Sequence, residues 1–318
     1  AVTTISSSSV SDILEIVQNT GAAFTTASNY AVTLSDTTAS AANIKLINDD
    51  STGAIDMSAV TTISSSSVSD ILEIVQDTNA AFTTAADYAV TISDTSASAA
   101  NIKLINADST GAIDMSAVTT ITSSSISDIL EIVNNTGAAF TTHADYAVTI
   151  SDTSASAANI KLINADSTGA IDMSAVTTIT SSSTSDVLEI VNNTDAAFTT
   201  ANNYAVTLND TASAANANTI MNDTAGIVTA TVTATGAVAD LNTALANATA
   251  NDALTLVLNA TSASAADLNT LNGKTSVNIN AATIETITSS TADDVNTAVT
   301  NKTAIGLDGD WDVTLSDT

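Results

Sequence analysis

The chain has 318 residues, a formal net charge of −29, and neither proline nor cysteine. Thirty-four acidic side chains outnumber five cationic ones, which excludes binding to nucleic-acid phosphates or anionic membrane surfaces and favours solubility and cation binding. No stretch approaches the ~18 consecutive apolar residues of a membrane-spanning helix, so we expect no membrane insertion.

A repeat of 58 residues organises the first two-thirds of the chain. The segment AVTTISSSSVSDILEIV recurs nearly unchanged, beginning at Ala1, Ala59, Ala117 and Ala175. Within the repeat, TGAAFTTA at 20–27 matches TGAIDMSA at 52–59, so each repeat holds two related half-repeats. We predict four tandem repeats over 1–223, the fourth degenerate, and diverged half-repeats that continue the same fold over 224–318.

The first predicted helix covers residues 10–17. Val10, Ile13, Leu14 and Val17 stand at the i, i+3, i+4 and i+7 positions of one buried stripe. A helix of this length is marginal in water by itself. Packing against strands and neighbouring helices must therefore hold it.

The following segments predict the rest of the repeat. Residues 32–34 are rich in β-branched and aliphatic side chains and read as a strand. The polar residues at 35–37 suit an N-cap, and a short helix is predicted over 39–47. Gly53 marks a turn before a second short strand over 54–58.

The fold class follows from this pattern. About eleven helical segments give about 29 residues per half-repeat, a period typical of stacked repeat architectures. We predict an α/β repeat solenoid of about eleven β–β–α coils with parallel strand ladders that run along its length. Two aromatic columns recur once per repeat, Phe24, Phe82, Phe140, Phe198 and Tyr30, Tyr88, Tyr146, Tyr204. We expect the Phe column in the core and the Tyr column half-buried in loops.

One recurring loop carries a metal-ligand pattern. Oxygen-bearing side chains stand at its first, third, fifth and ninth places, with Gly at the sixth, as in the calcium loops of EF-hand and dockerin-like sites. The candidate ligands are Asn48, Asp50, Thr52, Asp56, Asn106, Asp108, Thr110, Asp114, Asn164, Asp166, Thr168 and Asp172. The glutamate of the twelfth place is missing, so calcium would need a further ligand from a neighbouring half-repeat.

The same loops have a structural interpretation that needs no metal. Asn ends a helix, Asp and Ser satisfy turn amides, and Gly adopts a positive φ. Both interpretations stand from the sequence alone. A second acidic motif, Ser-Asp-Thr or Asn-Asp-Thr, is interpreted as a helix cap at Asp36, Asp94, Asp152, Asp210 and Asp317.

Candidate catalytic residues are scarce. The single histidine, His143, is replaced by Ala at the matching positions of the other repeats. The serines lack a paired base, and no Gly-rich phosphate loop is present. Four of the five glutamates recur at one helix position, which is typical of a solvated face. We therefore expect no enzymatic activity.

The chain also holds Asn-x-Ser/Thr sequons that can carry sugars in a glycosylating compartment. They lie at Asn134, Asn192, Asn209, Asn222, Asn247, Asn259 and Asn301. In a chain so rich in Asn and Thr, several such sequons arise by chance.

A strand ending in Ser-Asp-Thr and followed by Ala-Ser-Ala-Ala-Asn-Ile, at 93–102, recurs in altered form at 263–268. This pattern resembles the tandem repeats of very large secreted or surface proteins of bacteria, notably cyanobacterial ones described as hemolysin-like, adhesin-like or surface-layer-like. The resemblance implies an extracellular, cell-surface location. The calcium-binding glycine-rich nonapeptides of those families are absent here.

Three function classes follow. The first is a structural surface component, a fibre, stalk or surface-layer scaffold, which we expect to be a slice of a longer array and to self-associate through exposed strand edges at its ends. The second is an adhesion module for surface glycans or cells, with the Tyr30 column as its exposed face. The third is ice binding, suggested by the Thr-x-Thr stretch at 229–235, which does not repeat.

Overall fold

The computed structural model of the protein describes residues 1–18, 24–76, 81–192 and 197–316. Contacts divide the chain into two compact units. The N-terminal unit comprises Ala1–Ser151 and Leu162–Asp172, and the C-terminal unit comprises Asp152–Lys161 and Met173–Thr318. This division falls within the third repeat and does not test the boundary at 223 that sequence repetition indicates.

The described residues contain eleven helices of seven to ten residues and one of four. The helices are α1 Val10–Val17, α2 Ala41–Asp50, α3 Val68–Val75, α4 Ala99–Asp108, α5 Ile126–Val133, α6 Ala157–Asp166, α7 Thr184–Asn192, α8 Ala214–Asp223, α9 Val238–Ala244, α10 Ala265–Asn272, α11 Ala292–Thr300 and α12 Lys302–Ile305. None of them is both long and apolar enough to cross a membrane.

The strands are short and distributed along the whole described chain. They are β1 Val2–Ser8, β2 Thr26–Leu34, β3 Thr38–Ser40, β4 Ile55–Met57, β5 Thr62–Ser66, β6 Phe82–Thr84, β7 Ala89–Ile92, β8 Ser96–Ser98, β9 Ile113–Met115, β10 Thr120–Ser124, β11 Phe140–Thr142, β12 Ala147–Ile150, β13 Ser154–Ser156, β14 Ile171–Met173, β15 Thr178–Ser182, β16 Phe198–Thr200, β17 Ala205–Ser213, β18 Val228–Ala234, β19 Ala253–Leu258, β20 Ser262–Ala263, β21 Thr286–Ser290 and β22 Asp312–Leu315.

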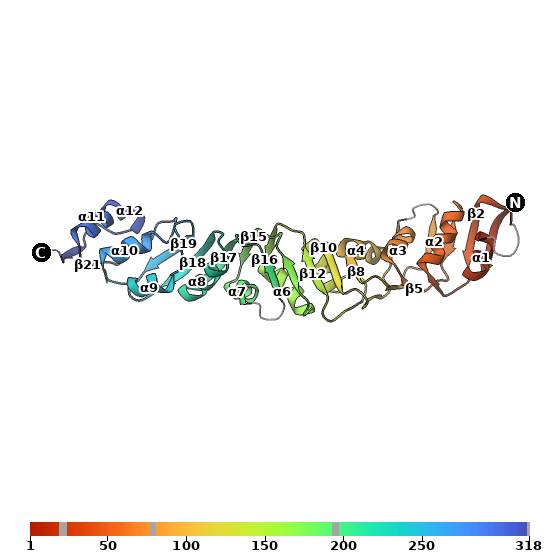
Figure 1. Cartoon of the computed structure of the whole chain (residues 1–318), viewed down its shortest axis with the longest axis horizontal. Helices are drawn as coiled ribbons and strands as arrows, with labels where there is room; N and C mark the ends of the chain where they lie inside the picture. The colour runs from red at the N-terminus through yellow and green to blue at the C-terminus, as the bar shows by residue number, and fades with distance from the viewer. Residues whose placement is uncertain (19–23, 77–80, 193–196, 317–318) are drawn as a thin grey trace. The chain divides into compact units, whose positions relative to one another are not determined.

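Each repeat consists of two strand–helix half-repeats. The first half-repeat has two strands and a helix, as in β4, β5 and α3, and matches the expected β–β–α order. The second half-repeat, as in β6, β7, β8 and α4, has a third short strand immediately before its helix. In the N-terminal unit, α2, α3 and α4 follow one another as neighbours (Figure 1). The α/β class and the repeated units are therefore confirmed.

The strand ladders are parallel, as predicted, but they do not run the length of the chain. The N-terminal unit has the strand orders β1-β2-β4-β6 and β3-β5-β7-β9-β11, and the C-terminal unit has β13-β15-β17-β18-β19 and β20-β21-β22. Equivalent strands pair in some places, as in β5–β7, whereas different strands pair in others, as in β3–β5 and β7–β9. The two half-repeats contain different numbers of strands. Along the sheet β3-β5-β7-β9-β11, the pairing therefore passes from the third strand of a half-repeat to second strands and then to first strands, where the sheet ends.

Aliphatic ladders form the core. Ile63, Val90 and Ile113 are aligned across β5, β7 and β9, and all three are almost fully buried. The helices add the buried stripe expected of them, for example Ile71 in α3 and Ile102 in α4. These contacts remove the apolar face of each short helix from water, which is the main stabilising term for a helix of this length.

The helix boundaries follow local capping. Helix α1 has the predicted bounds, and the Ser9 side chain accepts a hydrogen bond from the Asp12 amide at its start. The second helix begins at Ala41, two residues later than predicted, because Ser40 is its N-cap. Ala39 is in β3 instead, aligned with Ile63 of the next half-repeat. Pairing with β5 of the next half-repeat thus makes residues 38–40 a separate short strand, which overlaps the first residues of the predicted helix.

Candidate functional site

The loops with the predicted calcium pattern lie between each second-half-repeat helix and the following strand. In the second repeat, Asn106 lies in the last turn of α4 and is buried, and Asp114 lies in β9. The Asn106 amide nitrogen donates to Glu131 Oε1 at 2.8 Å and to the Thr136 carbonyl at 2.7 Å. Its oxygen accepts from the Ala138 amide at 2.8 Å. This side chain therefore ties three segments together.

The other candidate ligands of the second repeat also have protein partners. Asp108 accepts a hydrogen bond from the Tyr88 hydroxyl at 2.6 Å, and Thr110 donates to the Ala86 carbonyl at 3.2 Å. Asp114 accepts from the Ser116 amide, and this bond lowers the pKa of the Asp114 carboxyl. The oxygens are thus directed to different neighbours.

The other two copies follow the same plan. Asp50 and Asp166 accept from Tyr30 and Tyr146, at 2.8 and 2.7 Å. Thr52 donates to the Ser28 carbonyl, and Asp56 accepts from the Ser58 side chain and the Ser58 amide, which lower the pKa of the Asp56 carboxyl. The remaining candidates are placed equivalently: Asn48 and Asn164 are buried at helix ends, the Thr168 amide donates to the Ala144 carbonyl, and Asp172 is in β14.

Nowhere in the described ranges do three or more Asp, Glu or His side chains form a group that could hold a metal ion. The arrangement supports the structural interpretation of the loops, in which side chains satisfy turn and neighbouring groups. One detail of that interpretation was wrong. The glycines Gly53, Gly111 and Gly169 do not have a positive φ. Glycine is required for another reason. A Cβ at any of these three positions would lie 2.2 Å from the carbonyl oxygen of the tyrosine 23 residues earlier, which is Tyr30, Tyr88 or Tyr146.

Calcium binding at these loops stays an untested prediction from the sequence. The hydrogen bonds of the loop residues argue against it. Because the loop oxygens already have partners, we expect a chelator to leave the melting temperature unchanged, and calcium to act no differently from sodium at equal ionic strength. Differential scanning calorimetry with and without EDTA measures this. A melting temperature that falls with EDTA and returns with calcium, but not with magnesium, would show a specific site.

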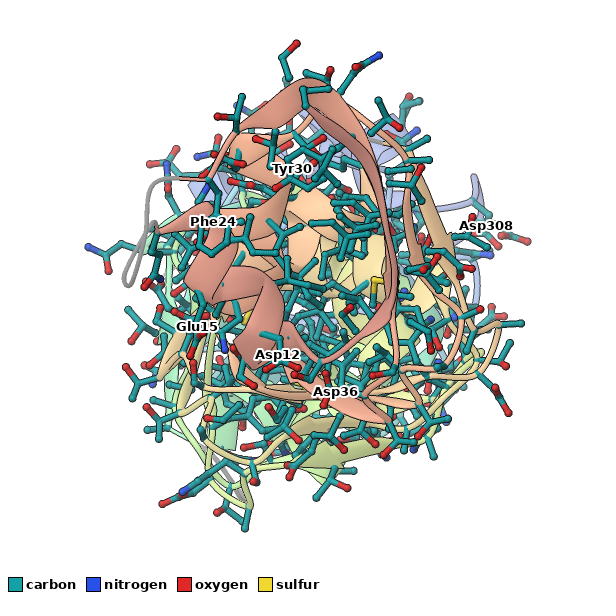
Figure 2. All side chains as sticks on the ribbon, turned by 90° about the vertical axis from the view of Figure 1, so that its right-hand side faces the viewer. Asp12, Glu15, Phe24, Tyr30, Asp36 and Asp308 are labelled. Atoms are coloured by element: carbon teal, nitrogen blue, oxygen red, sulfur yellow. The ribbon has the colours of Figure 1, made fainter. Side chains whose placement is uncertain are left out.

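The aromatic columns are placed opposite to the sequence expectation. Tyr30, Tyr88, Tyr146 and Tyr204 are 0–1% exposed. By contrast, Phe24 is 47% exposed, and the other described members of its column are half-buried. Figure 2 shows Tyr30 inside the first half-repeats and Phe24 at the rim on the side of Glu15. The tyrosines can be buried because each hydroxyl donates to a carboxylate, which removes the cost of an unpaired buried polar group.

The buried tyrosines predict a steep loss of stability at alkaline pH. Burial, with the hydrogen bond to Asp108, raises the pKa of Tyr88 far above its ordinary value of about 10, and the other three tyrosines are raised for the same reasons. A raised pKa stabilises the fold fully below the unfolded value of about 10, and this stabilisation is lost as pH rises above it. We expect tyrosinate absorbance to appear together with loss of the helical circular-dichroism signal.

Two controls sharpen this alkaline titration. The Tyr88→Phe variant has one ionisable group fewer, so its free energy of unfolding should fall less steeply with pH above 10 than that of the wild type. Tyrosine ionisation with a midpoint near 10 in a chain that keeps its helical signal would contradict the account.

The Ser-Asp-Thr motif does cap helices, but not the helices that follow it. Asp36 accepts from the Val10 amide at 2.6 Å, and Asp94 accepts from the Val68 amide at 2.6 Å, so each reaches back to the helix of the preceding half-repeat. Asp210 does the same for Thr184 at 2.9 Å. Figure 2 shows Asp36 close to Asp12 of α1. The predicted cap at Asp317 lies outside the described residues.

The second-half-repeat helices receive the same kind of cap from a serine. The Ala41 amide donates to Ser66 Oγ, and the Ala99 amide donates to Ser124 Oγ, both at 2.8 Å. The serines belong to the half-repeat that follows. The N-termini of α1 to α4 are thus closed by the half-repeat that follows each of them, a link that the sequence shows only as a spacing of 25 or 26 residues.

Lysines form a further link between half-repeats. Lys45 pairs with Glu73, Lys103 with Asp128 at 2.9 Å, and Lys161 with Asp186 at 3.1 Å. The hydrogen bonds raise the pKa of each lysine and keep it charged. These pairs are partly exposed, so each contributes little to stability. The recurring glutamates, expected to be simply solvated, therefore include ion-pair partners.

The remaining candidates offer no reactive constellation. The half-buried His143 pairs with the exposed Asp145 at 2.5 Å in a turn. Threonines of β18 align with those of neighbouring strands, Thr229 with Thr207 and Thr231 with both Thr211 and Thr255. Thr229 aligns on its other side with Ala253, and the third threonine of β18 aligns with a valine, so the ranks are short. The regular threonine ranks expected of an ice-binding face are therefore not formed by these strands.

Comparison with known proteins places the chain in no group. No protein-family model, curated protein or solved structure matches it.

Proposed function

We propose that the half-repeats wind into a solenoid that serves as a non-catalytic structural component of the cell surface, as part of a fibre, stalk or surface-layer scaffold. The observation that carries the proposal is the linking of half-repeats by side chains. Helix caps and lysine pairs recur with the repeat and join neighbouring half-repeats, while the tyrosine–carboxylate bonds close each second half-repeat on itself. Because each repeat of such an array contacts its neighbours, the array can carry load along its length.

The composition supports the same role. An acidic surface of net charge −29 keeps an extended array soluble and prevents indiscriminate lateral association. The single histidine, His143, lies in a turn and pairs with Asp145. The resemblance of the repeats to those of bacterial surface proteins adds the proposed location.

End-to-end self-association belongs to this proposal. Within the described strands, β22 pairs with β21 alone. An unpaired edge of this kind accepts a further strand from a second copy of the chain. Electron microscopy of the purified protein then shows rods or fibres, whereas uniformly short particles count against self-association.

The localisation experiment uses antibodies raised against the repeat. On intact source cells, we expect immunogold label outside the envelope and loss of the antigen after external protease treatment. A cytoplasmic protein, protected until lysis, is the control. An antigen that survives protease in intact cells and is digested only after lysis would overturn the proposed role.

Adhesion is the second candidate, and one observation favours it. The Tyr30 column cannot be its exposed face, because those side chains are buried. The Phe column is the alternative, since Phe24 is 47% exposed and its described counterparts are half-buried. Exposed aromatic rings provide contact area for a partner. Loss of cell attachment in a Phe24→Ser, Phe82→Ser and Phe140→Ser variant that still assembles normally would support adhesion.

A further inference from the structure

The C-terminal unit contains a polar recess of about 560 Å³ that the regular repeats do not predict. This volume falls within the roughly 300–1,000 Å³ of small-molecule sites. The recess lies between the turn before β17, the loop after α8 and the loop after α9. Residues from three successive half-repeats therefore line it.

The recess coincides with a break in the repeat. Met221 stands where the regular copies have the buried asparagine represented by Asn106. In the second repeat, that asparagine holds the next linker through the Thr136 carbonyl and the Ala138 amide. A methionine thioether cannot form these hydrogen bonds. At this position, the side chain that secures the linker in the second repeat is lost.

Four asparagines give the recess its chemistry: Asn202, Asn222, Asn247 and Asn251. Among the residues that the structure describes, the Asn202 and Asn251 side chains make no hydrogen bond. Asn247 Nδ2 has two long contacts, 3.4 Å to Asn222 Oδ1 and 3.5 Å to the Asn218 carbonyl, and the Asn222 amide nitrogen stays available. Each carboxamide offers two donors and one acceptor, which matches hydroxyl groups that both donate and accept.

The two carboxylates of the recess are already engaged. Asp252 accepts from the Val228 amide at 2.9 Å, from the Thr249 amide at 2.8 Å and from the Thr249 hydroxyl at 3.0 Å. Asp223 accepts from the Tyr204 hydroxyl at 2.5 Å. A calcium ion would have to displace these donors, and an anionic ligand would meet two negative charges without a cation among the lining residues. A neutral ligand is favoured.

We propose that this recess binds a neutral saccharide unit, held by the carboxamides of Asn202, Asn222 and Asn251. Met221 and Ala225 supply the non-polar lining against which the C–H face of a sugar ring packs. No aromatic ring lines the recess, so we expect binding of a single sugar unit to be weak. The site goes beyond the proposed scaffold role and does not depend on it.

The test uses the full chain, produced in a host without N-glycosylation because Asn222 and Asn247 belong to sequons. Saturation-transfer NMR is recorded with the methyl glycosides of glucose, galactose, mannose and N-acetylglucosamine, with methyl glucuronide as the charged comparison. We expect a signal from at least one neutral glycoside and none from the glucuronide. No signal from any neutral glycoside, or a stronger signal from the glucuronide, would overturn the proposal.

Variants locate the binding. Asn202→Ala and Asn251→Ala should each weaken it by about three- to tenfold, the effect of one net hydrogen bond. Asn203→Ala is the matched control, since this exposed neighbour does not line the recess. An equal loss in the Asn203 variant would contradict the assignment. So would glycoside binding that calcium abolishes at constant ionic strength, because the ion would then occupy the site. Equal melting temperatures exclude unfolding as the cause.

Discussion

Replacing Tyr88 with Ala is expected to lower the free energy of unfolding by about 3–5 kcal/mol, the cost of removing a large buried aromatic side chain. Tyr88 is 1% exposed, and its hydroxyl bonds to Asp108 on the other side of the half-repeat. The truncation leaves a cavity and removes this link. The half-buried Phe82 is the matched control in the same half-repeat, and its replacement with Ala should cost about 1 kcal/mol.

Urea denaturation of the three proteins measures this difference. Tyr88→Phe separates the two contributions, because it keeps the ring and removes only the hydroxyl, for an expected loss of about 1–2 kcal/mol. If Phe82→Ala costs more than Tyr88→Ala, then the phenylalanines form the core column, as the sequence suggested, and the placement of the tyrosines is wrong.

The second large effect is expected from Gly111→Ala. A Cβ at this position would lie 2.2 Å from the Tyr88 carbonyl oxygen and 2.4 Å from that of Asp87. Both are backbone atoms, so relief requires the two half-repeats to move apart. We expect a loss of about 1–3 kcal/mol or more, as for overpacking elsewhere in protein interiors.

Gly309→Ala is the control for the glycine experiment, since nothing lies within 4 Å of its added Cβ. This change should stay within about 0.5 kcal/mol of the wild type. Thermal and urea unfolding of both variants provide the comparison. Equal stabilities of the Gly111 variant and the wild type would show that the half-repeats are not in close contact at this turn.

Local periodicity was sufficient to predict the helices but not their neighbours. Helix α1 has the predicted bounds because its stripe of Val10, Ile13, Leu14 and Val17 is a property of the segment itself. The start of α2 was missed because it depends on the pairing of Ala39 with Ile63 in another half-repeat. Sheet length was missed for the same reason, since an unpredicted third strand changes the pairing partner.

The candidate site shows the same limit more clearly. The spacing of oxygen-bearing residues matched a calcium loop, but spacing does not reveal which neighbour each oxygen meets. Asp108 bonds to Tyr88, 20 residues away, and Asn106 bonds to Ala138, 32 residues away. A repeat sequence conceals such partners. Every position recurs with the same period of 58 residues, so the spacing does not show which two positions are in contact. A single substitution, Met221 for the recurring asparagine, was the sequence signal for the recess.

The measurement that tests the solenoid most directly is small-angle scattering of a chain with one extra 58-residue repeat, a copy of 59–116 inserted after residue 116. A solenoid lengthens in proportion to its residue count, so we expect the radius of gyration to rise by about 18%, with a matching increase in maximum dimension. A compact globule follows a power of about 0.38 in chain length and rises by only about 7%. An increase near that lower value, or loss of cooperative folding, would contradict the solenoid.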